Sequence, residues 1–181
     1  FVNRRTFLDP ETFEFREEVV CERAVPTLLG VNPYQGFIDL EYKVLNPDGV
    51  IRKLLLHKSG SDFISHIFGV AAASAYLGVT PSIEPSGMRI GDRLLPFFDC
   101  YEPEAGQRMR SYLVNYAGGN RHFDEISYAE AIKGKFPHGF FSNRLVLIGT
   151  RAMGTSEDVK FCPYGALSGV EIHANLLHNI L

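Results

Sequence analysis

A continuous apolar run late in the chain constrains the fold most. In NRLVLIG, residues 143–149, four apolar residues follow one another from Leu145 to Ile148, and Gly149 closes the run. This pattern is typical of a strand that is buried on both faces, because neither face then carries polar residues. Such strands lie inside sheets that helices cover, so the run predicts an inner strand of an α/β domain.

Two shorter strands are predicted earlier in the chain. QGFIDL at 35–40 and VIRKLLL at 50–56 have strand-like patterns, and NPDG at 46–49 lies between them. Proline presets φ and glycine accepts a positive φ, so NPDG is a strong turn signal. We therefore expect a hairpin with a longer loop, in which Asp48 and Arg52 pair across the turn.

Three segments are predicted to be helical. The first is 61–77, from an N-cap at Ser61 to Gly78, and the other two open with the capping boxes SYAE at 127–130 and SGVE at 168–171. A small hairpin at 88–95 and a strand at 111–119 complete the pattern. We expect an α/β fold, a mixed sheet flanked by helices in a single domain, with an irregular and incomplete part at 1–35 and the body at 36–181.

Composition excludes several classes of protein. The 181 residues carry a formal net charge of -3, which gives no electrostatic case for nucleic-acid binding. No apolar run reaches the length of about 18 residues that a membrane span needs. The three cysteines, Cys21, Cys100 and Cys162, form no CxxC pair, and which two of them would form a disulfide stays open.

The C-terminal stretch SGVEIHANLLHNIL, residues 168–181, combines a glutamate with two histidines. His173 and His178 are five residues apart, so they lie roughly 140° apart around a helix and cannot share a metal. His173 falls among the apolar residues, which predicts a buried histidine with a hydrogen-bond partner. Glu171 is interpreted as a capping residue. Because no stop signal follows, we expect the helix to run on toward a membrane.

The loop after the apolar run is the better candidate for ligand binding. Loops at the carboxyl ends of strands line ligand crevices in α/β folds. We predict an anion-binding nest here, with five candidate residues: Gly149, Thr150, Arg151, Gly154 and Asp158. No phosphate-binding glycine motif supports a nucleotide site, and a purely structural turn remains the alternative.

No catalytic motif is present, because the chain lacks a GxSxG nucleophile elbow and a zinc motif. A hydrolase with a triad assembled only in space remains an alternative. So does metal binding by His57, His66 or His122. We predict no cofactor and no metal.

Several elements resemble, in their order, the CHASE2 family of sensory domains. The matching segments are GFIDLEYKVLNPDGVIRKLLLH (36–57), YLVNYAGG (112–119), FDEISYAEAIKG (123–134), NRLVLIGTRAMGTSED (143–158) and GVEIHANLLHNIL (169–181). The motif positions are Asp48, Gly49, Arg52, Asn115, Tyr116, Gly118, Ser127, Gly149, Asp158, Gly169, Glu171, His173 and Asn175. The resemblance carries over no catalytic residue, and we interpret most of these positions as structural.

The resemblance implies a domain outside the cytoplasmic membrane of a bacterium, flanked by transmembrane helices. The implied cytoplasmic output is a class III adenylate or guanylate cyclase, a histidine kinase or a Ser/Thr kinase. We expect a non-catalytic input domain, most often of a cyclase, which responds to a small molecule or a protein and acts as a homodimer. The alternative is a dimerisation or spacing module without a ligand.

Overall fold

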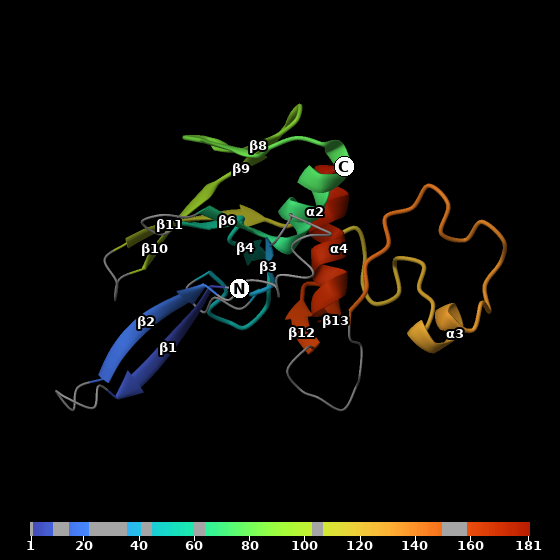
Figure 1. The fold of residues 1–181 in the computed structure, drawn as a ribbon. Coiled ribbons are helices and arrows are strands. Elements are labelled where there is room, and N and C mark those ends of the chain that lie inside the picture. The colour runs from blue at the N-terminus through green and yellow to red at the C-terminus, as the bar shows by residue number, and fades with distance from the viewer. Residues whose placement is uncertain are drawn as a thin grey trace.

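The computed structural model describes residues 2–8, 15–21, 36–40, 45–59, 64–102, 107–149 and 159–181, and only the backbone for 2–8, 15–21, 101–102 and 107–108. Two helices packed together form the centre (Figure 1). They are α2 (Phe68–Leu77) and α4 (Gly169–Ile180), and a short third helix, α3 (Tyr128–Ile132), lies away from them.

Small sheets surround the two central helices. The strands are β1 (Val2–Leu8), β2 (Phe15–Cys21), β3 (Gly36–Phe37), β4 (Lys53–Leu54), β5 (His57–Ser59), β6 (Ile64–Ile67), β7 (Ser82–Glu84), β8 (Gly87–Ile90), β9 (Arg93–Pro96), β10 (Phe98–Glu102), β11 (Gln107–Leu113), β12 (Val159–Cys162) and β13 (Gly165–Ser168). In the sheet β3-β6-β5, β6 pairs in parallel with β3 and antiparallel with β5. The predicted α/β class with a mixed sheet flanked by helices is confirmed.

The two central helices touch closely because of one glycine. A Cβ atom added at Gly69 of α2 would lie 3.0 Å from Cδ2 of Leu176 on α4. Ile172, Leu176 and Ile180, which recur every four residues on α4, are almost completely buried. The core therefore lies between the helices and the surrounding strands.

The local signals of the sequence were largely correct. Gly49 has a φ of 74° and its N–H donates to the Asn46 carbonyl, so NPDG forms the predicted turn. The capping box at Ser168 is present, and Ser127 caps α3 by accepting a hydrogen bond from the Glu130 N–H. The hairpin predicted at 88–95 forms from β8 and β9.

The predicted partners of the early strands were wrong. β3 pairs with β6 and β4 pairs with β11, so 35–40 and 50–56 form no hairpin in the described residues. Backbone groups of several strands can satisfy one another equally well, and the turn alone did not choose between them.

The first helix is shorter than predicted. It begins at Phe68, because residues 64–67 form β6 and pair with strands on both sides. Ile64 and Ile67 are β-branched and suit a strand. The predicted N-cap, Ser61, lies outside the described residues.

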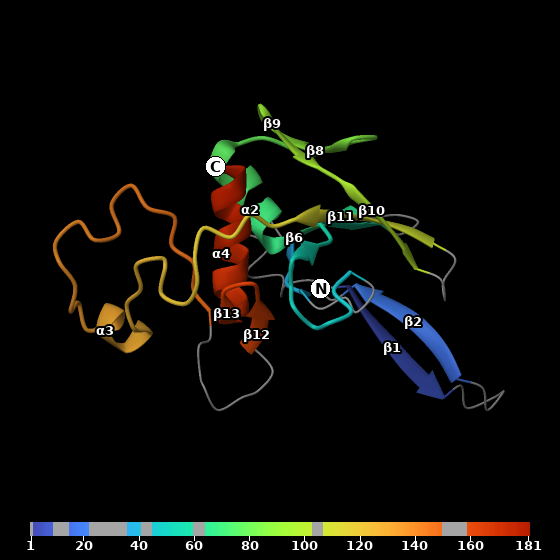
Figure 2. The same cartoon turned by 180° about the vertical axis from the view of Figure 1, so that it is seen from behind.

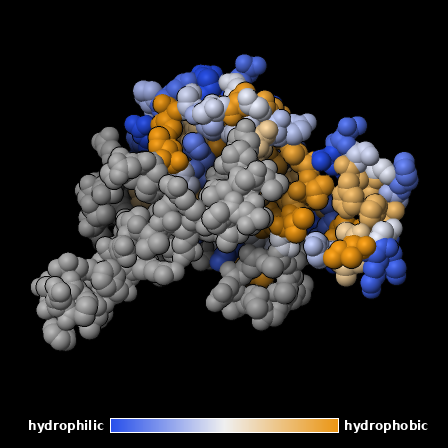
Figure 3. All heavy atoms as spheres, in the orientation of Figure 1, coloured by the Kyte–Doolittle hydropathy of each residue, from blue (hydrophilic) through white to orange (hydrophobic). Residues whose placement is uncertain are grey.

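The inner strand predicted at 143–149 does not form. Residues 144–149 have no regular structure, and Leu145, Val146 and Ile148 are 41%, 50% and 75% exposed. The run lies beside the two central helices, and only Leu147 is partly buried against the core. The two helices already bury most of their apolar residues against each other and the strands, so the run packs at their edge with one side open (Figure 3).

A lobe that contains α3 extends from the central helices, as the two opposite views show (Figures 1 and 2). Phe136, Phe140 and Phe141 pack on one another in this lobe, with ring centroids 4.8 to 6.4 Å apart. The Arg144 guanidinium lies 5.1 Å from the Phe140 ring and pairs with Asp124. The lobe therefore has a small aromatic cluster of its own.

Candidate functional site

The polar face of α4 holds a neighbouring stretch of backbone. Glu171, Asn175 and Asn179 are spaced four residues apart, so they form one row along the helix. We call these three residues the polar row. Its partners are backbone groups between residues 115 and 121, a segment that follows β11.

The contacts of the polar row are specific hydrogen bonds. The Asn175 Oδ1 accepts from the Ala117 N–H at 2.9 Å, and its Nδ2 donates to the Glu171 carbonyl. The Asn179 amide accepts from the Asn115 N–H at 2.9 Å and donates to the Asn115 carbonyl at 2.7 Å. The Asn179 side chain therefore binds this segment much as an adjacent strand would, through one donor and one acceptor.

Glu171 has two functions at the start of α4. Its Oε2 accepts from the N–H and hydroxyl of Ser168, which completes the capping box. Its Oε1 accepts from the Arg121 N–H at 3.1 Å. The predicted capping role is confirmed, and the second contact fastens the end of the 115–121 segment.

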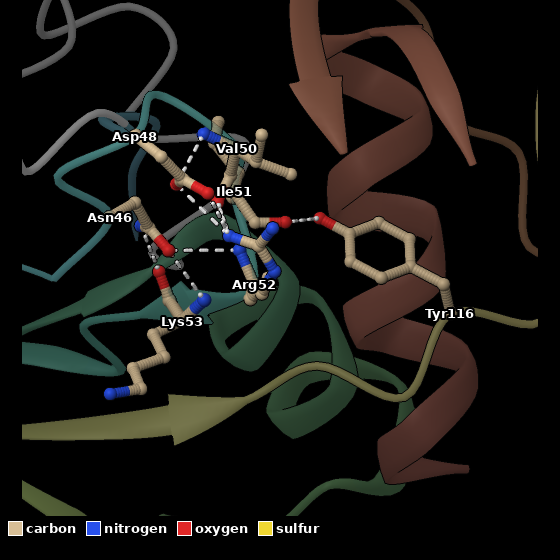
Figure 4. A network of polar contacts seen from close by, with 7 residues as sticks. All are labelled: Asn46, Asp48, Val50, Ile51, Arg52, Lys53 and Tyr116. Atoms are coloured by element: carbon tan, nitrogen blue, oxygen red, sulfur yellow. Dashed lines mark hydrogen bonds and ion pairs between the residues drawn. The ribbon is translucent and has the colours of Figure 1, made fainter. Parts of the chain in front are cut away.

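Tyr116 connects this segment to the NPDG turn, as Figure 4 shows. Its hydroxyl donates to the Ile51 carbonyl at 2.9 Å, and its side chain is only 7% exposed. Burial, together with the nearby Cys162, raises the pKa of Tyr116, so the hydroxyl stays protonated and remains a donor. The 115–121 segment is thus bound on one side to α4 and on the other to the turn.

The NPDG turn has its own polar network (Figure 4). The Asn46 side chain accepts from the Arg52 and Lys53 N–H groups and donates to the Lys53 carbonyl. The predicted pair of Asp48 and Arg52 forms at 2.8 Å and is exposed. The Arg52 hydrogen bond and the Val50 N–H lower the pKa of Asp48. Asn46, which the sequence analysis did not single out, organises this turn.

His173 is buried on the opposite side of α4, as predicted. It is 4% exposed, its Nε2 lies 3.4 Å from the Ile38 carbonyl, and the Phe68 ring stands edge-on at 5.4 Å. His178 is exposed beside Phe123, with 6.1 Å between the ring centroids. The two histidines thus face different surroundings. The part of the chain described here contains no cluster of three or more potential metal ligands.

The predicted anion-binding nest lies mostly beyond what the structure describes. Thr150, Arg151, Gly154 and Asp158 fall outside the described residues, so the nest stays a prediction. Gly149 is described and lies against the first turn of α4, where an added Cβ would be 2.6 Å from the Val170 Cβ.

An apolar pocket of about 210 Å³ lies between the two central helices and the apolar run. Its lining comes from α2, α4, Gly36 and the apolar run, namely Gly36, Phe68, Ala71, Ala72, Ala75, Leu145, Val146, Leu147 and Leu177. Among the described residues, no ionisable side chain lines this pocket, so its chemistry suits an apolar group.

The two cysteines with described side chains are free thiols. Cys162 is buried, which raises the pKa of its thiol and disfavours the reactive thiolate. Cys100 lies 3.6 Å from the Lys53 ammonium and is half-buried. The side chain of Cys21 is outside the described residues.

Comparison with known proteins identifies the family. The family model described as the CHASE2 domain matches residues 10–181, so the match begins within the part that was expected to be irregular. No curated protein and no solved structure matched the chain. None of the helices in the described part of the chain has the length and apolar character of a membrane span. CHASE2 domains are extracytoplasmic sensory domains of signalling receptors and are not catalytic. The chain therefore belongs to the CHASE2 family.

Proposed function

We infer that this domain is the input domain of a bacterial transmembrane receptor whose output is a class III adenylate or guanylate cyclase. We also propose that α4 carries its signal. The observation behind this inference is the way α4 is held on two sides. Ile172 and Leu176 pack into the core, while the polar row binds the 115–121 segment. A shift of α4 therefore requires both contacts to change together.

Such a helix has two sets of contacts that can favour one arrangement over another. A ligand or partner that prefers one arrangement shifts the population toward it by its difference in affinity. Because hydrogen bonds of the polar row are directional, a displaced helix must exchange them for other partners or for water. We propose that α4 passes this shift toward the membrane.

The location of the domain is tested first. Alkaline phosphatase, fused after Leu181 in the full receptor with all upstream sequence kept, becomes active only outside the cytoplasm. We expect an active fusion, and an active cytoplasmic reporter at the same position would contradict the extracytoplasmic assignment.

The role of α4 is tested by breaking the polar row. In the full receptor, Asn175→Ala together with Asn179→Ala is expected to shift the basal production of cyclic nucleotide by several-fold. Lys135→Ala, at an exposed position just after α3, serves as the control and should leave it unchanged. Unchanged output with a normally inserted, folded double variant would refute transmission through α4. If the receptor transfers phosphate to a protein and makes no cyclic nucleotide, its output domain is a histidine or Ser/Thr kinase.

A dimerisation or spacing module without a ligand remains the second proposal. The exposed apolar side chains Leu145, Val146 and Ile148 favour it, because large apolar patches mark contacts between proteins. Sedimentation of the chain over a range of concentrations tests for the expected homodimer.

A further inference from the structure

Two histidines face each other on neighbouring strands next to α2. His57 of β5 and His66 of β6 are directly paired in the antiparallel register. Directly paired residues point to the same face of a sheet, with Cβ atoms roughly 5 Å apart. Both side chains are half-buried, so water screens the pair only in part.

The surroundings of His57 disfavour a positive charge. Its ring packs on Phe97 with 5.8 Å between centroids, and the Arg110 guanidinium from β11 lies 5.8 Å from the same Phe97 ring. Among the described side chains of β3 to β6, β10 and β11, the other charged residues are Lys53, Lys58 and Asp99. Lys53 of β4 contacts Cys100, Lys58 of β5 pairs with Asp39 after β3, and Asp99 is paired in register with Arg110. Arg110 is the charge that acts on His57, and His57 acts in turn on His66.

Protonation would also leave a buried donor. The Nδ1 atom of His57 is buried and has no hydrogen-bond partner among the described residues. A neutral imidazole can keep Nδ1 as a bare acceptor, but an imidazolium carries an N–H on both nitrogens. A proton on Nδ1 thus adds the cost of a buried, unpaired donor. A second proton on His66 adds repulsion between like charges.

We propose that acidification is a signal for this domain and that the pair of His57 and His66 detects it. This inference rests on the proposed function. Protonation weakens the β5–β6 pairing, and β6 continues without a break into α2, with Ile67 as the N-cap. α2 packs along α4, so a disturbance at the histidine pair reaches the helix that carries the signal.

The pH range follows from the direction of the shifts. Burial is the main cause that lowers the pKa of both histidines below the ordinary value of 6.5. A group with a lowered pKa in the folded state contributes stability above its unfolded pKa and loses it as the pH falls through the folded pKa. We therefore expect the domain to lose stability below about pH 6.5.

The test measures unfolding of this chain by urea from about pH 8 to about pH 5, a range that spans histidine titration. Carboxylates also titrate there, so the comparison is with the double variant His57→Gln, His66→Gln. His138→Gln, an exposed histidine, is the control. As the pH falls from about 8 to about 5, the equilibrium constant for unfolding should increase. We expect the increase in the wild type and the control to exceed that in the double variant about tenfold for each unit of pKa shift. An equal rise in all three chains would overturn the proposal.

A second measurement does not depend on any variant. Proton NMR of the folded wild type follows the imidazole signals of His57 and His66 through the same range. Titration of both rings below 6.5 supports the pair as a detector. Ordinary titration of both rings would refute it.

An output assay of the full receptor distinguishes failure of this proposal from failure of the proposed function. Wild-type output is expected to change several-fold when the external medium goes from about pH 7.5 to about pH 5.5, and the double histidine variant should lose this response. If the variant keeps it while the Asn175 and Asn179 substitutions still shift basal output, proton sensing fails and the sensory role of α4 stands. If neither pair of substitutions has an effect, the proposed function fails as well.

Discussion

The polar row of α4 and the apolar run at 144–149 show opposite outcomes for two similarly clear sequence patterns. The polar row lies on the face of α4 opposite its apolar residues, yet Asn175 is 1% exposed and bound to backbone 58 residues away. The apolar run was predicted to be buried on both faces, yet Ile148 is 75% exposed. Burial in this domain is decided by which segment reaches a face, and residue type alone does not determine it.

The largest predicted effect contrasts the apolar positions of the two regions. Leu176→Ala removes a fully buried side chain between the central helices and is expected to lower the free energy of unfolding by about 2 to 5 kcal/mol. Leu145→Ala in the apolar run is the matched control and should cost less than about 1 kcal/mol, because Leu145 is 41% exposed. Urea unfolding measures both. Equal losses would mean that the run is buried after all.

Next comes the polar row itself. Asn175→Ala leaves the Ala117 N–H without its acceptor at a buried position and should cost about 1 to 3 kcal/mol. Asn179→Ala should cost less, because its contacts with Asn115 are exposed and water can replace them. Thermal unfolding of both variants checks the order. An Asn175→Ala variant as stable as the wild type would argue against the row as a structural tie.

A smaller effect is expected at the link between the row and the NPDG turn. Tyr116→Phe removes the hydrogen bond to the Ile51 carbonyl and should cost about 0.5 to 1.5 kcal/mol. Tyr128→Phe on α3 is the control, because that side chain is 66% exposed. Urea midpoints of the two variants are compared. A larger loss for Tyr128 would show that the α3 lobe contributes more than its exposure suggests.

The smallest effect is expected at Asp48. Asp48→Asn breaks the exposed pair with Arg52, which water and salt screen. The lowered pKa of Asp48 means that its contribution is present above its unfolded pKa and is lost as the pH falls through the folded pKa. Unfolding midpoints at neutral pH should therefore barely change, and a clear loss there would give the turn more weight than we assign.

Local features of the fold were predictable from the sequence because their partners lie within a few residues. The capping box of Ser168 and Glu171 and the pair of Asp48 and Arg52 are of this kind. The partner of Asn175 could not be read from local pattern, although a polar residue at every fourth position of α4 was a usable signal. Most of the predicted ligand loop lies outside the described residues, so its role rests on sequence alone.

The apolar run shows why periodicity has limits. A continuous apolar stretch can be a strand buried on both faces, a strand packed on a single side or an irregular segment. The sequence pattern alone does not distinguish these three structures. The ISHI segment, residues 64–67, was predicted to belong to the helix at 61–77. It forms β6 instead, because strands on both sides pair with it. Strand pairing decided the structure of the ISHI segment, whereas packing against the edge of the central helices decided that of the apolar run.

Amide hydrogen exchange tests the tie between α4 and the 115–121 segment most directly. The account predicts that the Asn115 and Ala117 amides exchange slowly in the wild type, and that the Ala117 amide alone accelerates strongly in Asn175→Ala. The Gly118 amide, for which the described residues provide no acceptor, serves as the internal reference. Rapid exchange of Asn115 and Ala117 in the wild type, at the rate of Gly118, would contradict the account.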